Sequence, residues 1–231
     1  MSEIKVNKIS PATSTETTLG DANDKFIVPS GAELEVASGA TITNSGTATN
    51  FGGGAGMTFL ERQTASSAST VDFDGNFSST YTNYILYFSN IYMSSDAQIQ
   101  LRVRQSDTAM TNNYYCSACL MNHRTGSAPY NSTVNYGSFN ETSFGYLHKY
   151  NIDGTVGEPS AGHLYIHNPL DATGGKCFTG NFVTQEDNNS TNNQNTSIYW
   201  DENTSALSGI TIITSSGTVN GIFDLYGFAN S

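Results

Sequence analysis

The chain has 231 residues, of which 37% are hydrophobic, 11% aromatic and only 13% charged. This length accommodates one large β domain, or a small module followed by one domain with its own hydrophobic core. Nine Lys and Arg against twenty Asp and Glu give a formal net charge of -11, which excludes the basic surface of a nucleic-acid binder and disfavours contact with an anionic membrane.

Asn, Ser and Thr replace charged residues as the main polar side chains, and they occur in runs such as residues 188–193. These side chains compete with the backbone for hydrogen bonds, so they favour turns and strands over helix interiors. The composition therefore predicts an all-β chain.

The sequence shows no targeting segment. Its N-terminus has no apolar signal-peptide region, and no stretch approaches the ~18 apolar residues of a membrane span. Three cysteines are odd in number and sparse, which argues against a disulfide scaffold. We expect a protein that is made in a cytoplasm, carries no signal peptide and does not insert into membranes.

Residues 29–36, 37–44 and 45–50 form three imperfect copies of a turn followed by a short strand. Such short rungs cannot bury their single apolar column within one chain. We expect residues 1–50 to be an anchoring segment of β-rungs, resembling a β-prism or triple-stranded β-helix, and the chain to be a homotrimer. Its candidate trimerisation residues are Val28, Leu34, Val36 and Ile42. A β-arm that becomes ordered only on docking to another protein is the alternative.

Residues 51–57 are rich in glycine and predict a linker between two domains. From residue 58 to 231, segments with a period of two alternate with turn-rich stretches, which predicts eight to ten strands. Eight or so antiparallel strands suit a jelly-roll-like β-sandwich. The expected strands are Ser69–Phe73, Tyr84–Tyr92, Ala97–Arg104, Tyr114–Leu120, Phe144–Tyr150, Gly162–Asn168, Cys177–Thr184, Ile198–Asp201, Gly209–Thr214 and Gly221–Phe228.

In two of these segments the pattern of apolar residues predicts which faces of the strand are buried. Ala97–Arg104 alternates cleanly, so Ile99, Leu101 and Val103 should face inward. Tyr84–Tyr92 is apolar on both faces, which predicts a strand that is covered on both sides.

Both ends of the chain resemble virion proteins of marine tailed phages, notably cyanophages. The N-terminal resemblance rests on residues 4–11 (IKVNKISP), 18–21 (TLGD), 27–32 (IVPSGA) and 40–52 (ATITNSGTATNFG). The C-terminal resemblance rests on residues 207–228, which look like the closing β-hairpin of such proteins, with Gly217 in its turn. The resemblance implies a virion component, often a fibre, in which a shared first segment precedes a variable β-rich domain.

The resemblance and the rungs together favour a virion structural protein that acts as a tail-fibre-like adhesin and contributes to host-surface glycan recognition. Residues 1–50 would contact other virion proteins. The alternative is a virion structural protein that does not bind a receptor, such as a capsid decoration, collar or baseplate component.

Catalytic and metal-binding patterns are weak, so we expect no enzyme, no metal and no cofactor. Cys116 and Cys119 form a Cys-x-x-Cys without a second pair for zinc. His163 and His167 would share a strand face but lie ~13 Å apart, too far to hold one metal. The carboxylates are scattered, and paired carboxylates are the minimum equipment of a glycosidase, the third function considered.

Aromatic and amide side chains are better candidates for binding than for chemistry. Tyrosine and tryptophan offer flat amphipathic faces on which sugars stack, and Asn, Ser and Thr offer hydrogen bonds. Tyr130 and Tyr136 fall in an expected loop at 125–140. The candidate glycan contacts are Asn113, Tyr114, Tyr115, Tyr130, Tyr136, Tyr199, Trp200 and Asp201, although Trp200 and one tyrosine of each pair could belong to the core.

Overall fold

The computed structural model describes residues 27–28, 30–33, 35–38, 40, 56–124, 132–141, 143–152, 160–186 and 190–229. The chain divides into two compact units, Met1–Phe51 and Gly52–Ser231. The anchoring role expected for residues 1–50 stays a prediction.

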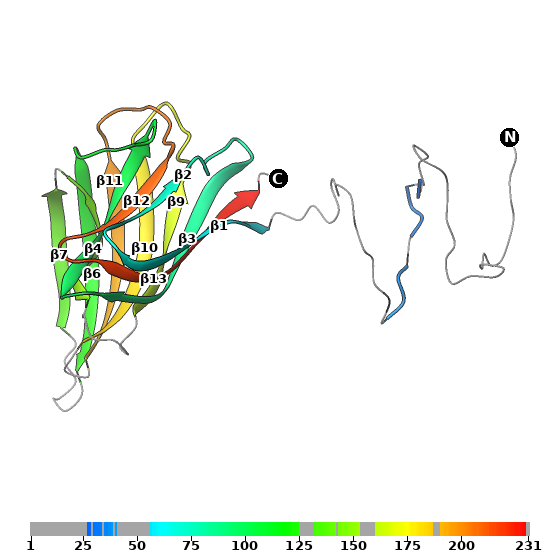
Figure 1. The fold of residues 1–231 in the computed structure, drawn as a ribbon. Helices are drawn as coiled ribbons and strands as arrows, with labels where there is room; N and C mark the ends of the chain where they lie inside the picture. The colour runs from blue at the N-terminus through cyan, green and yellow to red at the C-terminus, as the bar shows by residue number, and fades with distance from the viewer. Residues whose placement is uncertain are drawn as a thin grey trace, which may run out of the picture. The chain divides into compact units, whose positions relative to one another are not determined.

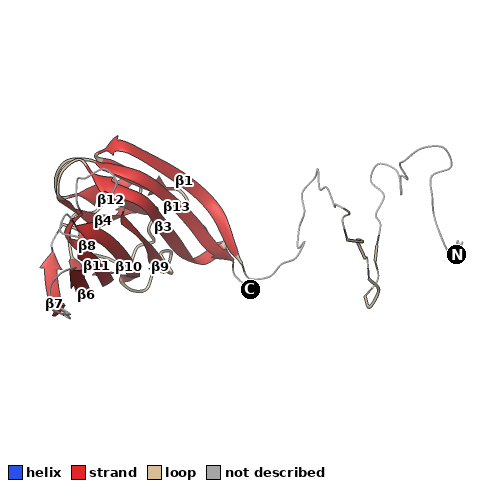
Figure 2. Ribbon diagram, turned by 90° about the horizontal axis from the view of Figure 1, so that it is seen from below, coloured by secondary structure: helices blue, strands red, loops and turns tan. Residues whose placement is uncertain are grey.

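The second unit is built from strands, and the described residues contain no helix (Figures 1 and 2). No helix that could span a membrane is therefore present in the described part of the chain. The strands are β1 (Met57–Ala68), β2 (Thr70–Asp74), β3 (Tyr81–Met93), β4 (Ala97–Gln105), β5 (Thr108–Ala109), β6 (Tyr114–Arg124), β7 (Ser132–Glu141), β8 (Gly145–Ile152), β9 (Ser160–His167), β10 (Lys176–Glu186), β11 (Ser190–Trp200), β12 (Gly209–Thr214) and β13 (Val219–Ala229).

Two antiparallel sheets make up this unit. The large sheet has the order β1-β13-β3-β9-β10-β11-β6-β7, and the small sheet has the order β2-β12-β4-β5, with β8 also paired to β4. This arrangement confirms the all-β antiparallel sandwich expected from the period-two segments.

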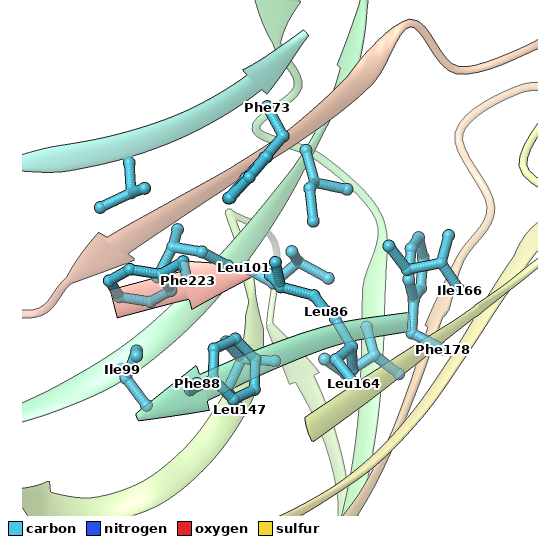
Figure 3. Packing of buried hydrophobic residues seen from close by; sticks show 14 of the residues in the cluster. Phe73, Leu86, Phe88, Ile99, Leu101, Leu147, Leu164, Ile166, Phe178 and Phe223 are labelled. Atoms are coloured by element: carbon cyan, nitrogen blue, oxygen red, sulfur yellow. The ribbon is translucent and has the colours of Figure 1, made fainter. Parts of the chain in front are cut away.

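The core lies between the two sheets, where inward side chains from both interdigitate (Figure 3). Ile99, Leu101 and Val103 on β4 are fully buried, as the alternation predicts. Phe88 and Phe223 make an edge-to-face contact with ring centroids 5.8 Å apart. Burying one such large apolar side chain contributes about 1.5–3 kcal/mol, so these strands are held mainly by their inner faces.

The C-terminal segment does not form the hairpin that the sequence predicts. β12 pairs with β2 and β4 in the small sheet, whereas β13 pairs with β1 and β3 in the large sheet. Gly217 does lie in the turn, with a φ of 64°. The turn carries the chain from one sheet to the other because β12 and β13 both direct apolar side chains into the core between the sheets.

Strand β11 is longer and more polar than expected, since the sequence predicts a strand only from Ile198. Its inner face buries Gln194 and Thr196. These side chains bond the backbone of β8: Thr196 Oγ1 donates to Tyr146 O at 2.8 Å, and Gln194 Oε1 accepts from Lys149 N at 2.9 Å. The polar run thus fastens β8 over the large sheet.

The prediction that β3 is covered on both sides is wrong. Tyr87 on its outer face is 38% exposed, and no second layer lies over this face in the described part of the chain. Ile85 is nevertheless buried, and its partners in register on the neighbouring strands are Tyr226 and Tyr165. Flanking aromatic side chains shield this position instead of another sheet.

In the first unit, Val28 and Val36 are exposed in the single chain. Leu34 and Ile42 lie outside the described residues. Trimerisation through these four positions stays a prediction.

Candidate functional site

A hollow of about 290 Å³ lies on the large sheet, across strands β6, β11 and β10. Two tyrosines stand at one side of it and small hydroxyl side chains line it. Its lining residues are Tyr115, Cys116, Ser117, Cys177, Phe178, Thr179, Ser197, Ile198 and Tyr199. The volume is close to the lower end of the ~300–1,000 Å³ range of ligand pockets, which suits one sugar ring better than a large ligand.

Tyr115 and Tyr199 are direct partners in the β6–β11 register, so both side chains project from the same face. They are 43% and 38% exposed. Their ring centroids lie 6.4 Å apart and the rings are tilted by 44°. The pair presents exposed aromatic surface at the edge of the hollow.

The remaining outward side chains of the hollow are small: Cys177 lies beside Tyr199, and Ser117, Ser197 and Thr179 form the next row of the sheet. Ser197 pairs with Ser117 on one side and with Thr179 on the other. His167, on β9 opposite Cys177, also contacts this row, since its Nε2 lies 2.9 Å from Thr179 Oγ1. Three hydroxyl groups beside two aromatic rings offer both hydrogen bonds and apolar contact.

A group of amides continues the polar surface along β10 and β11. Asn181 Nδ2 donates to the side-chain oxygens of Asn193 and of Asn195, the latter at 3.1 Å. Asn195 precedes Ser197 by two residues, so the amides lie on the same face as the hollow. Asn181, Asn193 and Asn195 therefore extend the polar surface beyond the hollow.

Gly175 sets the position of Tyr199. A β-carbon at Gly175 would lie 2.4 Å from the Tyr199 hydroxyl oxygen and 2.8 Å from Trp200 O. Only a residue without a side chain leaves room for the phenol in this orientation.

The lining of the hollow includes no charged side chain. The nearest cation along β10, Lys176, is buried on the opposite side, where its ammonium donates to Asp171 O and Gly174 O at 2.6 and 2.8 Å. Burial lowers the pKa of Lys176 below its usual value. The hollow is therefore suited to an uncharged ligand.

Two predicted contacts, Tyr114 and Trp200, belong to the core. Both are buried, because alternation turns them inward when Tyr115 and Tyr199 face out. Tyr114 Oη accepts a hydrogen bond from Val103 N, and burial raises the pKa of Tyr114 above its usual value. These two residues support the site but cannot touch a ligand in the hollow.

The other predicted contacts have mixed positions. Asn113 and Asp201 are exposed just beyond the tyrosine pair and are joined by a backbone hydrogen bond of 3.1 Å. Tyr130 lies outside the described residues. Tyr136 lies in strand β7, opposite Ala118, and not in the expected 125–140 loop.

No carboxylate or histidine is among the described residues that line the hollow. Asp72 and Asp74 both pair with Arg104, at 3.2 and 2.6 Å. His163 and His167 lie in a cluster of aromatic rings on the large sheet. Among the described residues, no group of three or more His, Cys, Asp or Glu could hold a metal ion.

The geometry defines an exposed face of an all-β sheet that carries a hollow without charged lining residues. No protein-family model, curated protein or solved structure matches the chain. The functional proposal therefore depends on the chemistry of this surface and on the resemblance described above.

Proposed function

We propose that the chain is a virion structural protein that acts as a tail-fibre-like adhesin and recognises a host-surface glycan. The observation that carries this proposal is the hollow beside Tyr115 and Tyr199, which combines exposed aromatic rings with three hydroxyl groups. The phage assignment depends on the resemblance at both chain ends.

In this proposal the two units have separate tasks. Residues 1–50 form a trimeric β-rung anchor that contacts other virion proteins, and the sandwich carries the glycan site. We further infer a jelly-roll-like connection, which is supported by the way β1, β2, β3 and β4 alternate between the two sheets. The proposal requires neither catalysis nor a cofactor.

The hollow favours a neutral sugar. An acidic sugar would bring a carboxylate to a protein with a net charge of -11, and no cation lines the hollow to compensate it. The apolar face of a neutral ring fits against Tyr115 or Tyr199, and the ring hydroxyls reach Ser117, Ser197 and Thr179.

Glycan binding is tested by titrating the full-length chain with soluble neutral oligosaccharides and with sialylated ones, after a glycan array has selected the probes. We expect Tyr115→Ala and Tyr199→Ala to weaken the intrinsic affinity at least about tenfold, which corresponds to ~1.4 kcal/mol. Tyr87→Ala is the matched control, because Tyr87 and Tyr199 are equally exposed at 38%. Preference for sialylated glycans, or equal effects of all three variants, would reject the proposed site.

The alternative is a virion structural protein that contacts only other subunits, such as a capsid decoration, collar or baseplate component. The number of copies per particle distinguishes these functions. Small multiples of three support a fibre, and hundreds of copies support decoration. The proposed adhesin function would be rejected if the purified protein stayed monomeric, did not bind host cells and did not block infection.

A further inference from the structure

A second surface stands out on the same sheet, across the outer faces of β1, β13, β3 and β9. We call it the aromatic face. Its members contact one another in an unbroken series of ring pairs with centroids 5.4–6.3 Å apart. The rings belong to Phe59, Tyr226, Tyr87, His163, Tyr165, His167 and Phe228.

The aromatic face exposes large apolar side chains at its β1 edge. Phe59 is 52% exposed, and Met57, two residues earlier on the same strand, is 49% exposed. Soluble monomers rarely expose contiguous apolar patches without a function, and aromatic residues and Met are enriched in protein interfaces. This composition differs from that of the hollow, whose lining combines two tyrosines with Ser117, Ser197 and Thr179.

The aromatic face carries little net charge. Its charged residues are Arg62 and Asp224, joined by two hydrogen bonds of 2.7 and 2.8 Å. They neutralise each other within a chain whose formal net charge is -11. Two copies of so acidic a chain repel one another through most orientations, but this face allows them to approach without like-charge repulsion.

Around Tyr226 the packing of the rings is unfavourable for sugar stacking, whereas Tyr165 lies nearly parallel to His167 and Phe228, at 21° and 16°. Phe59 and Tyr87 both contact Tyr226 in edge-to-face geometry, with interplanar angles of 72° and 83°. A sugar stacks on a flat ring that is free on one side, whereas Phe59, Tyr226 and Tyr87 are joined by edge-to-face contacts. The aromatic face therefore suits a protein partner rather than a second glycan.

We propose that the aromatic face binds a second copy of this chain. This inference goes beyond the proposed glycan function and does not depend on it. It also differs from trimerisation through residues 1–50, because the contact is made by the sandwich itself.

The expected association is weak. Four strands about 4.8 Å apart, each contributing about seven residues of ~3.4 Å, give roughly 450 Å². This is about half of the ~800 Å² that each partner buries in a standard stable interface. We therefore expect association that depends on concentration, unless another part of the chain holds the copies together.

Sedimentation velocity of the full-length chain over a range of concentrations tests the proposal. We expect Tyr87→Asp to weaken association at least about tenfold, because it places like charges in the contact. Tyr199→Asp is the matched control, with the same exposure in the parent chain, and should leave association unchanged. Ile42→Asp reports separately on the predicted N-terminal trimer.

A second measurement does not depend on the variants. Hydroxyl-radical labelling of the unmodified chain should decrease at Phe59, Tyr87 and Tyr165 as concentration rises, while Tyr115 stays reactive. The proposal is overturned if labelling of these three residues is constant, or if Ile42→Asp abolishes association that Tyr87→Asp leaves intact. Loss of glycan binding with association retained would instead count against the proposed function alone.

Discussion

The hydroxyl of Tyr114 on β6 accepts a hydrogen bond of 2.9 Å from the backbone N of Val103 on β4, and so joins the two sheets. The same hydroxyl donates to Met110 O at 2.9 Å. Because Tyr114 is buried, no water replaces either bond when the hydroxyl is removed.

Tyr114→Phe should therefore destabilise the sandwich by about 2 kcal/mol, since it leaves the Val103 N–H without its acceptor. Urea unfolding at neutral pH measures this change. Tyr115→Phe, at the exposed neighbour, should stay within about 0.5 kcal/mol of the parent. Equal effects of the two variants would contradict the assignment of Tyr114 to the core.

Arg104 joins the small sheet through several partners. It pairs with Asp74 and Asp72, and its Nη1 donates to Thr211 Oγ1 at 2.9 Å. Arg104→Ala should cost about 2 kcal/mol in urea unfolding, because it leaves a partly buried carboxylate without its cation. Arg62→Ala, which breaks the more exposed pair with Asp224, should cost clearly less. The reverse order would contradict this account.

The Asp74–Arg104 pair also predicts a response to acid. Burial alone would raise the pKa of Asp74, but hydrogen bonds from Arg104 and Ser208 outweigh it and hold this pKa below the usual 3.8. The pair's stabilisation is therefore present above pH ~3.8 and is lost as the pH falls through the folded-state pKa. Asp74→Asn should be less stable than the parent at pH 6, and this difference should shrink below pH 3. A difference that is independent of pH would exclude the ionised pair as its cause.

Gly175→Ala should act on glycan binding through Tyr199. The new methyl group overlaps the Tyr199 phenol and Trp200 O, so the ring must leave its position beside Tyr115. We expect weaker binding of the neutral sugar with a stability loss of about 1–3 kcal/mol, typical of overpacking. Unchanged affinity would show that the position of Tyr199 does not matter for binding.

Cys177 should report on occupancy of the hollow. It lines the hollow and is exposed, whereas Cys116 is buried and Cys119 is intermediate. We expect a maleimide to label Cys177 first, and saturating neutral sugar to slow this reaction. Peptide mass analysis identifies the labelled thiol. Labelling of Cys177 that ignores bound sugar would place the ligand elsewhere.

The sequence predicted well those strands whose two faces differ in polarity. In Ala97–Arg104 the apolar positions alternate with polar ones, and Ile99, Leu101 and Val103 do face the core. The alternation also separates outward Tyr115 and Tyr199 from inward Tyr114 and Trp200, but the sequence alone does not indicate which set faces the solvent.

The sequence could not predict structure that depends on distant partners. Gln194 and Thr196 were indistinguishable from surface residues, because their burial depends on bonds to the β8 backbone. Ser117, Thr179 and Ser197 carry no distinctive pattern and become neighbours only through the strand order. The outer face of Tyr84–Tyr92 can be apolar without a covering layer because Tyr226 and Tyr165, on the neighbouring strands, flank Ile85.

Strand β13 lies between β1 and β3, so the first and last strands of the sandwich are hydrogen-bonded neighbours, with Met57 opposite Phe228. Until β13 is synthesised, both β1 and β3 have an open edge that can pair with the wrong strand. Native pairing between strands that are far apart in the sequence also slows folding. We therefore expect the large sheet to close only after the ribosome has released the last strand, so that a nascent chain shortened by β13 would be prone to aggregate.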